Sequence, residues 1–460
     1  MNKYDVIVIG AGPGGYIAAI RTAEAGLKTA IIEKDALGGV CLNVGCIPSK
    51  SLLKNAEIAR TLRKNAALFG VSFDNLQLDY AAAVERSRKV SKRLNQGVGF
   101  LMKKNAIDVY EGTAVFQDAH SIRVEKAAGE AEQLEADAFI IAAGTHPFEI
   151  PGITPDGEKI LNYRQAILQP RLPGSVIIIG GGAIGVEFAT IWNSYGSQVT
   201  VVEMKDHLVP NEDPEAGAEL ERAFKKQGIK VKTGAALTGV TKTDHGVLAK
   251  IRSGNEESEI EAEQILVATG FQPNSQGLGL ESAGVETHPR GWILTDDRGK
   301  TNVGHIYAIG DITGKILLAH AASAMGKTAA ESIAGLETQP LNIDLIPHTT
   351  FSFPQIASFG LTETSAQEKG IPARAAKAGF IANGKALGIA ENEGWAKILY
   401  HAETGVVLGA TLIGPEVSEL LPELTLAASK RLTVKDLSNN VHAHPTLSEI
   451  IQEAAESIRE

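Results

Sequence analysis

The sequence has little cysteine, few aromatic residues and no long apolar run. Only two of its 460 residues are cysteine, Cys41 and Cys46, so a small fold stapled by several disulfides is excluded. No apolar stretch approaches the roughly 18 residues that a membrane-spanning helix needs. No basic leader or cleavage site precedes the first apolar segment, and we therefore expect a cytoplasmic protein.

The charged residues form no long acidic or basic block. It has 44 Lys and Arg against 54 Asp and Glu, a formal net charge of -10. Nucleic acid and anionic membrane surfaces are therefore poor partners. The length suggests about three domains. Glycine is abundant, at 48 residues, and eight of these glycines lie in two motifs, at residues 10–15 and 180–185.

The first motif is a strand, a glycine turn, a helix and a second strand that ends at Glu33. Gly10 permits the tight turn, Gly12 lets the backbone approach a pyrophosphate, and Gly15 allows the helix and strand to pack closely. The helix N-terminus offers free N-H groups to phosphate. Glu33 is placed to accept hydrogen bonds from an adenosine ribose.

The second motif repeats the first 170 residues later, with Gly180, Gly182 and Gly185 followed by Glu203. In both copies the acid lies 23 residues after the first glycine. Two copies with matching flanks predict two dinucleotide sites. A carboxylate at position 203 would bond a free ribose 2'-hydroxyl and repel a 2'-phosphate, which favours NAD over NADP.

Further apolar segments extend these units. Each motif is followed by a strand that ends in a small-residue turn, at Gly144 and at Gly270. A strand at residues 305–309 ends at Asp311 and leads to a helix near residues 319–334. This segment lies too far along the chain to complete the second unit, and it could instead return to the first. Strand-like stretches after residue 346, followed by helical periodicity, predict an α+β domain with an antiparallel sheet.

The two cysteines lie five positions apart, just before a helical stretch through Lys64. Such positions in an ideal helix are about 7.5 Å apart along the axis, too far for a disulfide. The helix must therefore bend or start late, and Gly45 makes that easy. A helix N-terminus near the sulfurs would stabilise a thiolate for exchange chemistry. Two unbonded thiols in a core, or a metal pair lacking other ligands nearby, are the alternatives.

Together these motifs resemble the flavin disulfide oxidoreductases of the class I pyridine nucleotide-disulfide oxidoreductase family, most closely the dihydrolipoamide dehydrogenases. The segments 41–50, 308–311 and 444–449 carry the resemblance with the two glycine motifs, in order along nearly the whole chain. It implies an α/β fold with two Rossmann-like doubly wound nucleotide-binding domains and a C-terminal α+β dimerisation domain. The implied domains are 1–147 with 275–345 for FAD, 148–274 for NAD, and 346–460 for the subunit interface.

The resemblance also implies roles for individual residues. Cys41 and Cys46 form a redox-active disulfide. His444 acts as acid and base on it from the other subunit of a homodimer, since Glu449 can hold one imidazole nitrogen and leave the other free. No metal is expected, and His442, which lacks such a partner pattern, is expected to be structural. The implied cofactor-binding residues are Gly10, Gly12, Gly15, Glu33, Lys50, Gly144, Asp311 and Ala319 for FAD, and Gly180, Gly182, Gly185, Glu187, Glu203 and Gly270 around NAD, with Lys50 and Glu187 paired beside the flavin.

The implied activity is the oxidation of protein-bound dihydrolipoamide to lipoamide with NAD as acceptor. The partners would be lipoyl domains of 2-oxo acid dehydrogenase or glycine cleavage complexes. A reductase of another small disulfide that uses NADH or NADPH remains an alternative, as does a flavoprotein that acts mainly as a binding partner. Phe271 and Gln272 depart from the pattern, because many relatives carry arginine in this turn.

Overall fold

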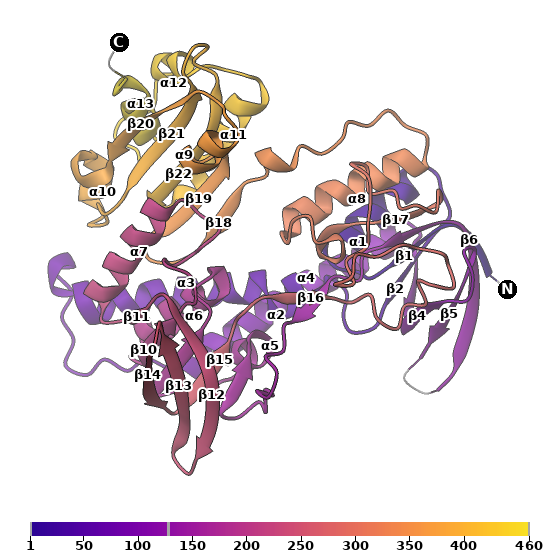
Figure 1. Cartoon of the computed structure of the whole chain (residues 1–460), viewed down its shortest axis with the longest axis horizontal. Helices are drawn as coiled ribbons and strands as arrows, with labels where there is room; N and C mark the ends of the chain where they lie inside the picture. Colours follow the sequence, from indigo (N-terminus) through magenta and orange to yellow (C-terminus); the bar gives the residue numbers. More distant parts are fainter. Residues whose placement is uncertain (1, 127–128, 459–460) are drawn as a thin grey trace.

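The computed structural model describes residues 2–126 and 129–458. Residues 1, 127–128 and 459–460, which the expected domains include, lie outside the described residues. The predicted α/β fold class is confirmed: two mostly parallel sheets carry helices, and an antiparallel sheet forms the C-terminal part (Figure 1). In the described part of the chain, no helix combines the length and the apolar character that a membrane crossing requires.

The first sheet has seven strands drawn from two distant parts of the chain. β1 at its centre pairs in parallel with β2 and β6, and β17 pairs in parallel with β6. The strand near residues 305–309 therefore returns to the first sheet. The strands are β1 (Asn2–Ile9), β2 (Thr29–Glu33), β3 (Asp108–Glu111), β4 (Thr113–Phe116), β5 (Ser121–Glu125), β6 (Ala131–Ile141) and β17 (Ile306–Ala308).

Two helices pack side by side on this sheet, α1 (Pro13–Glu24) and α8 (Ala319–Ile333) (Figure 1). They fit closely because small residues face each other: a Cβ on Gly326 would come within 2.5 Å of the carbonyl oxygen of Gly14. α8 starts after the 3-10 turn η3 (Gly310–Thr313), which follows β17.

The second sheet has five parallel strands in the order β11-β10-β9-β15-β8. Its helices include α5 (Tyr163–Leu168), α6 (Ala183–Tyr195) and α7 (Pro214–Gln227). A three-stranded antiparallel sheet, β12 (Ala235–Thr243), β13 (Gly246–Ser253) and β14 (Glu256–Ala262), projects beside it (Figure 1). The five strands are β8 (Ile160–Asn162), β9 (Ser175–Ile179), β10 (Gln198–Val202), β11 (Lys230–Lys232) and β15 (Gln264–Val267). A short antiparallel pair, β7 (Thr145–Pro147) and β16 (Phe271–Pro273), links the two units.

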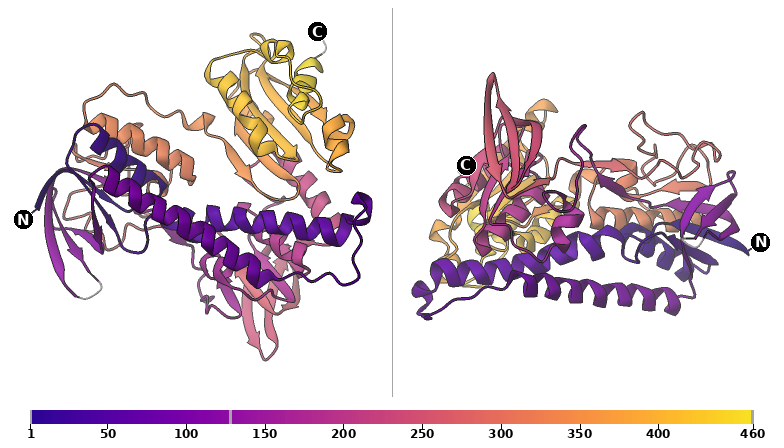
Figure 2. Two further views of the ribbon diagram at one scale, coloured as in Figure 1. Left: turned by 180° about the vertical axis from the view of Figure 1, so that it is seen from behind. Right: turned by 90° about the horizontal axis from the view of Figure 1, so that it is seen from below.

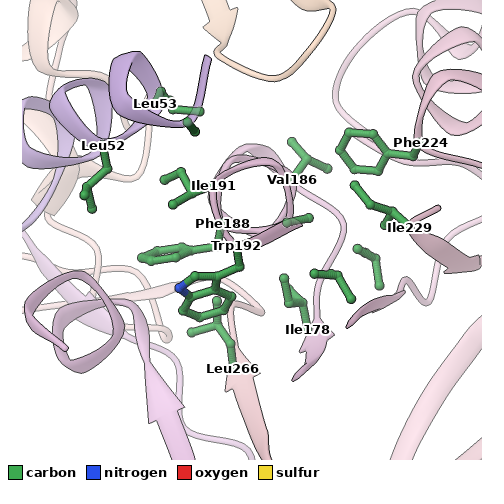
Figure 3. Close-up of a cluster of buried hydrophobic side chains, with 14 of the residues drawn as sticks. Leu52, Leu53, Ile178, Val186, Phe188, Ile191, Trp192, Phe224, Ile229 and Leu266 are labelled. Carbon is green, nitrogen blue, oxygen red and sulfur yellow. The ribbon is translucent and has the colours of Figure 1, made fainter. Parts of the chain in front are cut away.

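Helix α6 fixes the second unit to the cysteine segment. Trp192 and Phe188 on α6 lie against Leu266 and Ile178 of the sheet on one side, and Leu52 and Leu53 of α3 (Cys46–Arg60) approach from the other (Figure 3). Burial of apolar side chains of this size stabilises such a junction by about 1.5 to 3 kcal/mol each. The position of α3 against α6 is therefore set by a packed core.

Three further helical segments accompany α3. α2 (Gly39–Val44) precedes it, the π-helical turn η1 (Thr61–Asn65) continues it, and α4 (Tyr80–Lys104) packs along it (Figure 2). The helix predicted through Lys64 thus ends as an α-helix at Arg60, one turn earlier. A 3-10 turn, η2 (Ala67–Phe69), lies between η1 and α4.

The antiparallel sheet predicted after residue 346 is confirmed, with the strand order β18-β19-β22-β21-β20. Its helices form one compact core with the sheet. The strands are β18 (His348–Thr350), β19 (Gln355–Gly360), β20 (Ala373–Gly379), β21 (Trp395–His401) and β22 (Val407–Gly414). The helices are α9 (Glu363–Glu368), α10 (Gly384–Gly388), α11 (Val417–Ser429), α12 (Val434–Asn439) and α13 (Glu449–Glu456), and the 3-10 turns are η4 (Ile343–Leu345) and η5 (Phe380–Ala382).

Candidate active site

Two helix N-termini meet at the edge of the first sheet. α1 and α8 run in the same direction, since Ser323 Oγ donates to the Pro13 carbonyl at 3.3 Å and Arg21 Nη2 lies 2.9 Å from Glu331 Oε1 farther along. Ala319 is the first residue of α8. Free N-H groups and the partial positive charge of both helices therefore point to the same place, which suits an anionic group.

The turn before α1 has the geometry of a phosphate cradle. Gly10 has φ +99°, and a Cβ on Gly15 would lie 1.9 Å from the Gly10 carbonyl oxygen, so neither position accepts a side chain. A Cβ on Gly12 would meet nothing within 4 Å, which leaves open space in front of the helix. Glu33 Oε2 accepts the N-H of Ala11 at 2.7 Å and so faces the same turn.

The turn before α6 repeats these features closely. Gly180 has φ +105°, a Cβ on Gly185 would lie 1.9 Å from the Gly180 carbonyl oxygen, and Gly182 again faces open space. Glu203, which is buried, accepts the N-H of Gly181 at 2.6 Å through Oε2. The two glycine turns, 170 residues apart in the sequence, are thus equivalent in structure.

Two further glycines follow the strands beside these turns. Gly144 comes after β6 with φ +67°, and Gly270 comes after β15 with φ +118°. A Cβ at either position would meet open space, so the positive φ is the reason for glycine here rather than crowding. The strand pair β7 and β16 begins directly after them.

Two buried polar side chains near the start of α8 have few or no hydrogen-bond partners among the described residues. Asp311 on η3 accepts one hydrogen bond among the described residues, from Thr145 Oγ1 at 3.3 Å, and burial raises its pKa to about 6. The hydroxyl of Tyr163 is buried without a hydrogen-bond partner in the described chain. The guanidinium of the neighbouring Arg164 pairs with Asp35, with Nη2 2.8 Å from Oδ2.

Tyr163 lies near the cysteine pair. Burial is the main cause that raises the pKa of Tyr163, and the neighbouring Arg164 guanidinium partly opposes it. The nearby charges of Asp311 and Cys46 add a smaller rise. Buried hydroxyls are normally satisfied. An open phosphate cradle, an under-bonded carboxylate and an orphaned phenol fit a bound group that has phosphates, hydroxyls and a polar ring.

The cysteine pair lies where α2 ends and α3 begins. Cys41 is on α2, Cys46 is the first residue of α3, and Gly45 between them breaks the helix with φ -131° and ψ -116°. The predicted break at Gly45 is therefore confirmed. Both residues are free thiols in the structure, and they are within hydrogen-bonding contact of each other.

The surroundings shift the pKa values of the two thiols in opposite directions. The hydrogen bond from Cys41 lowers the pKa of Cys46, burial opposes this, and the ammonium group of Lys50 lowers it further. The same hydrogen bond and burial raise the pKa of Cys41. In the reduced pair, the thiolate therefore resides on Cys46, at the N-terminus of α3.

An ion pair lies next to the cysteines. Lys50 Nζ on α3 is 2.8 and 2.9 Å from the two carboxylate oxygens of Glu187 on α6. Glu187 also accepts the N-H of Phe351 at 3.3 Å, and the Phe351 ring lies under the Lys50 ammonium, 4.5 Å from Nζ to the ring centroid. The packed core around α6 thus holds the pair in place.

The imidazole predicted to be the base lies on the C-terminal domain. His444 Nδ1 is 2.8 Å from Glu449 Oε1, and the other carboxylate oxygen accepts the N-H of Thr446 at 2.8 Å. The Thr446 N-H and the imidazole lower the pKa of Glu449. The side chain of His444 is 77% exposed, and the bond to Pro445 is cis.

His442, which the sequence led us to expect as a structural residue, has a carboxylate partner that no sequence pattern indicated. Its Nε2 lies 3.0 Å from Glu423 Oε2 on α11, and its side chain is buried. Burial alone would lower the pKa of His442, but Glu423 raises it overall. The two paired residues are 19 positions apart in the sequence, so no local sequence pattern predicted the pairing. No group of three or more potential metal-ligating side chains gathers within residues 2–126 and 129–458.

Comparison with known proteins assigns the family. Residues 4–326 match the pyridine nucleotide-disulphide oxidoreductase family, and residues 346–455 match its dimerisation domain. The chain belongs to this family. It is 47% identical to the dihydrolipoyl dehydrogenase of Mycobacterium leprae, over 98% of this chain and 97% of the relative, and 45% identical to that of Corynebacterium glutamicum, over 99% and 98%.

Solved structures agree with this assignment. The crystal structure of LpdA from Mycobacterium tuberculosis matches with a TM-score of 0.91 and 29% identity, covering 99% of both chains. The copper complex of the flavoprotein disulfide reductase RclA from Escherichia coli matches with a TM-score of 0.89 and 26% identity, covering both chains fully.

This pyridine nucleotide-disulphide oxidoreductase is therefore a flavoprotein enzyme of a family that uses FAD and NAD, and the predicted family, enzyme class and cofactors are confirmed. Of the predicted site residues, the structure brings Cys41, Cys46, Lys50 and Glu187 together and places His444 with Glu449 elsewhere. It adds Tyr163, which sequence reasoning missed because its position depends on how α5 packs against α2.

Asp311, which the sequence predicts to bind FAD, allows that prediction to be tested by pH. Its pKa of about 6 lies above the ordinary 3.8, so the protonated carboxyl stabilises the folded apoprotein at low pH, and this stabilisation is lost as pH rises through 6. We expect Asp311→Asn to stabilise the apoprotein by about 2 kcal/mol at pH 8, with a gap that shrinks towards pH 5. It should also weaken FAD binding. Thermal unfolding of the apoprotein at both pH values and FAD titration check this, and an equal gap at both pH values would contradict it.

Proposed function

We propose that this enzyme is a homodimeric dihydrolipoyl dehydrogenase, which oxidises protein-bound dihydrolipoamide to lipoamide and passes the electrons to NAD. The observation that carries the proposal is that Cys41 and Cys46 lie in contact where α2 meets α3, with the Lys50 ammonium group near Cys46, between two glycine turns. The names of relatives at 45 to 47% identity support the same substrate.

The residues present fit both cofactors. The turn of Gly10, Gly12 and Gly15 and the N-termini of α1 and α8 would hold the FAD diphosphate, Glu33 its adenosine ribose, and Asp311 its ribityl hydroxyls. The turn of α6 with Glu203 would hold NAD. Bound FAD supplies a two-electron acceptor that reoxidises the dithiol, and NAD takes up the electron pair as hydride. The proposed domains are 1–147 with 275–345, 148–274, and 346–460.

Glu203 supports NAD as the acceptor. Its carboxylate closes the second glycine turn, at the place where a dinucleotide would put its adenosine ribose. A 2'-phosphate there would meet a negative charge in a buried setting. The only cationic side chain in the following residues 204–206 is Lys205.

The protein's own chemistry is a thiol-disulfide exchange. The partner subunit's His444 takes the proton of one substrate thiol, and the resulting thiolate attacks the Cys41 sulfur of the disulfide. The Cys41 bond to Cys46 breaks, and Cys46 leaves as a thiolate, as its lowered pKa favours. The second substrate thiol then displaces Cys41, which takes a proton. The substrate is oxidised to a disulfide, and the cysteine pair gains two electrons.

The exposed imidazole supports action across a dimer. α12 and α13, which flank His444 in sequence, lie well apart from α2 (Figure 1). An imidazole so placed has no access to the cysteines of its own chain. Glu449 holds Nδ1, which leaves Nε2 free to face a second subunit. The matched dimerisation domain supplies such an interface.

Lipoyl domains of 2-oxo acid dehydrogenase or glycine cleavage complexes are the proposed partners, because the substrate dithiol is carried on a protein. The proposal keeps the cytoplasmic location expected from the sequence. The chain's net charge of -10 argues against nucleic acid or an anionic membrane as a further partner.

The purified holoenzyme tests this function directly. We expect NAD reduction with dihydrolipoamide, and reduction of lipoamide by NADH, at rates at least about 100-fold above those with glutathione disulfide, coenzyme A disulfide or NADP. Steady-state assays with each disulfide and both nucleotides measure this. Faster turnover of another disulfide would favour the reductase alternative, and an FAD-loaded protein without turnover would favour a binding role.

A further inference from the structure

The separation of the two cysteine sulfurs depends on one helix junction. Cys41 sits on α2 and Cys46 opens α3, and the two helices are joined through Gly45 alone. α3 is fixed by its packing on α6 (Figure 3). α2 has only six residues and one fully buried side chain, Leu42. Such a short helix is not stable by itself, so something else must fix its angle.

Helix α4 contacts both sides of this junction (Figure 2). On the α3 side, Arg86 Nη1 donates to the Ser51 hydroxyl at 2.8 Å, to the Ser51 carbonyl at 3.1 Å and to Asn55 Oδ1 at 2.8 Å. These bonds lie on the second and third turns of α3. α4 is therefore tied to the helix that Cys46 begins.

On the α2 side, Arg88 donates from Nη1 to the backbone carbonyl of Asn43, between the two cysteines. This carbonyl belongs to the last turn of α2, whose acceptors have no partner within the helix. Asn95, two turns farther along α4 than Arg88, donates from Nδ2 to the Leu37 carbonyl at 2.7 Å and to Asn43 Oδ1 at 3.4 Å. Asn43 Nδ2 in turn donates to the carbonyls of Leu37 and Gly39, both at 2.9 Å.

We propose that Arg86, Arg88 and Asn95, the α4 clamp, are positioning residues that hold α2 against α3 at the angle that keeps the two sulfurs in bonding reach. This inference rests on the proposed function, because it concerns the same redox pair. The clamp bonds the backbone and side chains around the cysteines and leaves both sulfurs free to react.

The clamp is expected to favour the disulfide over the dithiol. A disulfide ties its two sulfurs at about 2.05 Å, whereas a dithiol has no such bond to hold α2. If α2 could swing about Gly45, the dithiol would gain conformational freedom that the disulfide lacks. Since the clamp removes that freedom, it raises the effective concentration of one thiol towards the other. The reduction potential of the pair is lowered accordingly.

Arg88→Met tests the clamp, because methionine fills a similar space without a donor. We expect the effective concentration of the pair to fall by about tenfold, which corresponds to a potential about 30 mV more positive. The measurement equilibrates the holoenzyme with dithiothreitol buffers, followed by rapid alkylation and counting of reduced Cys41 and Cys46 by mass spectrometry. Arg88→Lys, which keeps a donor, should restore at least half of the shift.

Arg93→Met is the matched control, since Arg93 is an exposed arginine on the same helix. It should leave the equilibrium within twofold of the wild type. Reduction of a quinone by NADH, which bypasses the cysteines, should stay unchanged in both variants. Asn95→Ala provides a second measurement if Arg88→Met folds poorly, with a smaller shift of the same sign.

The outcomes separate the clamp from the function on which it rests. If the wild-type holoenzyme forms no disulfide between Cys41 and Cys46, the proposed function fails. If the wild type forms it and Arg88→Met and Asn95→Ala both keep the same equilibrium, or Arg93→Met shifts it equally, the clamp alone is overturned.

Discussion

Cys46→Ser is expected to abolish the oxidation of dihydrolipoamide by NAD while the protein stays yellow with FAD. Serine cannot form the disulfide, and its hydroxyl does not ionise at neutral pH. The thiolate that the hydrogen bond from Cys41 and the Lys50 ammonium stabilise at this position is therefore lost. We expect a fall in kcat on the order of 10^4-fold or more, as for the removal of other reacting nucleophiles.

Three measurements check this result. The FAD content and the visible spectrum report whether the cofactor site survives, the dihydrolipoamide assay reports the disulfide, and quinone reduction by NADH reports the nucleotide sites alone. Cys41→Ser is the matched variant, because it removes the other sulfur at the same helix junction. Both variants should lose the oxidation of dihydrolipoamide and keep the reduction of quinone by NADH. Persistence of dihydrolipoamide turnover in either would refute the role of the pair.

His444→Gln is expected to lower kcat for dihydrolipoamide by about 10^2 to 10^4-fold, the usual contribution of a general base. Glutamine keeps a polar side chain near Glu449 but cannot take up a proton. Because the side chain of His444 is exposed, we expect the variant to fold normally, and unchanged thermal unfolding would verify this. Quinone reduction by NADH should again be retained.

A mixed dimer distinguishes action within a subunit from action across the interface. One subunit carries Cys46→Ser and the other His444→Gln. If the imidazole serves the partner, one of the two sites has both an intact cysteine pair and an intact base, and about half of the wild-type activity returns. If it serves its own chain, neither site is complete and activity stays near zero. The two variant homodimers, each inactive, are the controls.

The sequence predicted the parts of the fold that have local signals. The strands before Gly10 and Gly180 were predicted, because an apolar run that ends in a glycine turn is decided by neighbours in the chain. The sheet of β12 to β14 was not anticipated. Its strands carry exposed polar residues over much of their length, so they lack a clear apolar pattern.

The candidate site likewise has features that the sequence predicted and features that it did not. The break at Gly45 was predictable, since two cysteines five positions apart cannot bond within an ideal helix. The neighbours of Tyr163 and the acceptor of Arg88 were not, because they come from elements that meet only in the folded protein. His442 shows the limit most clearly: it lies in the loop between α12 and α13, and its carboxylate partner, Glu423, comes from α11.

The order of the strands along the chain also determines which unit can fold first during synthesis. All five strands of the second sheet come from residues 160–267, whereas the first sheet waits for β17 and for α8, which ends at Ile333. On the ribosome, the internal unit can therefore fold before the unit that begins the chain. Until β17 and α8 emerge, the end of β6 at Phe139–Ile141 lacks its β17 partner and the small-residue face of α1 stays uncovered, so a chain stalled between the two stages would be a natural client for chaperones.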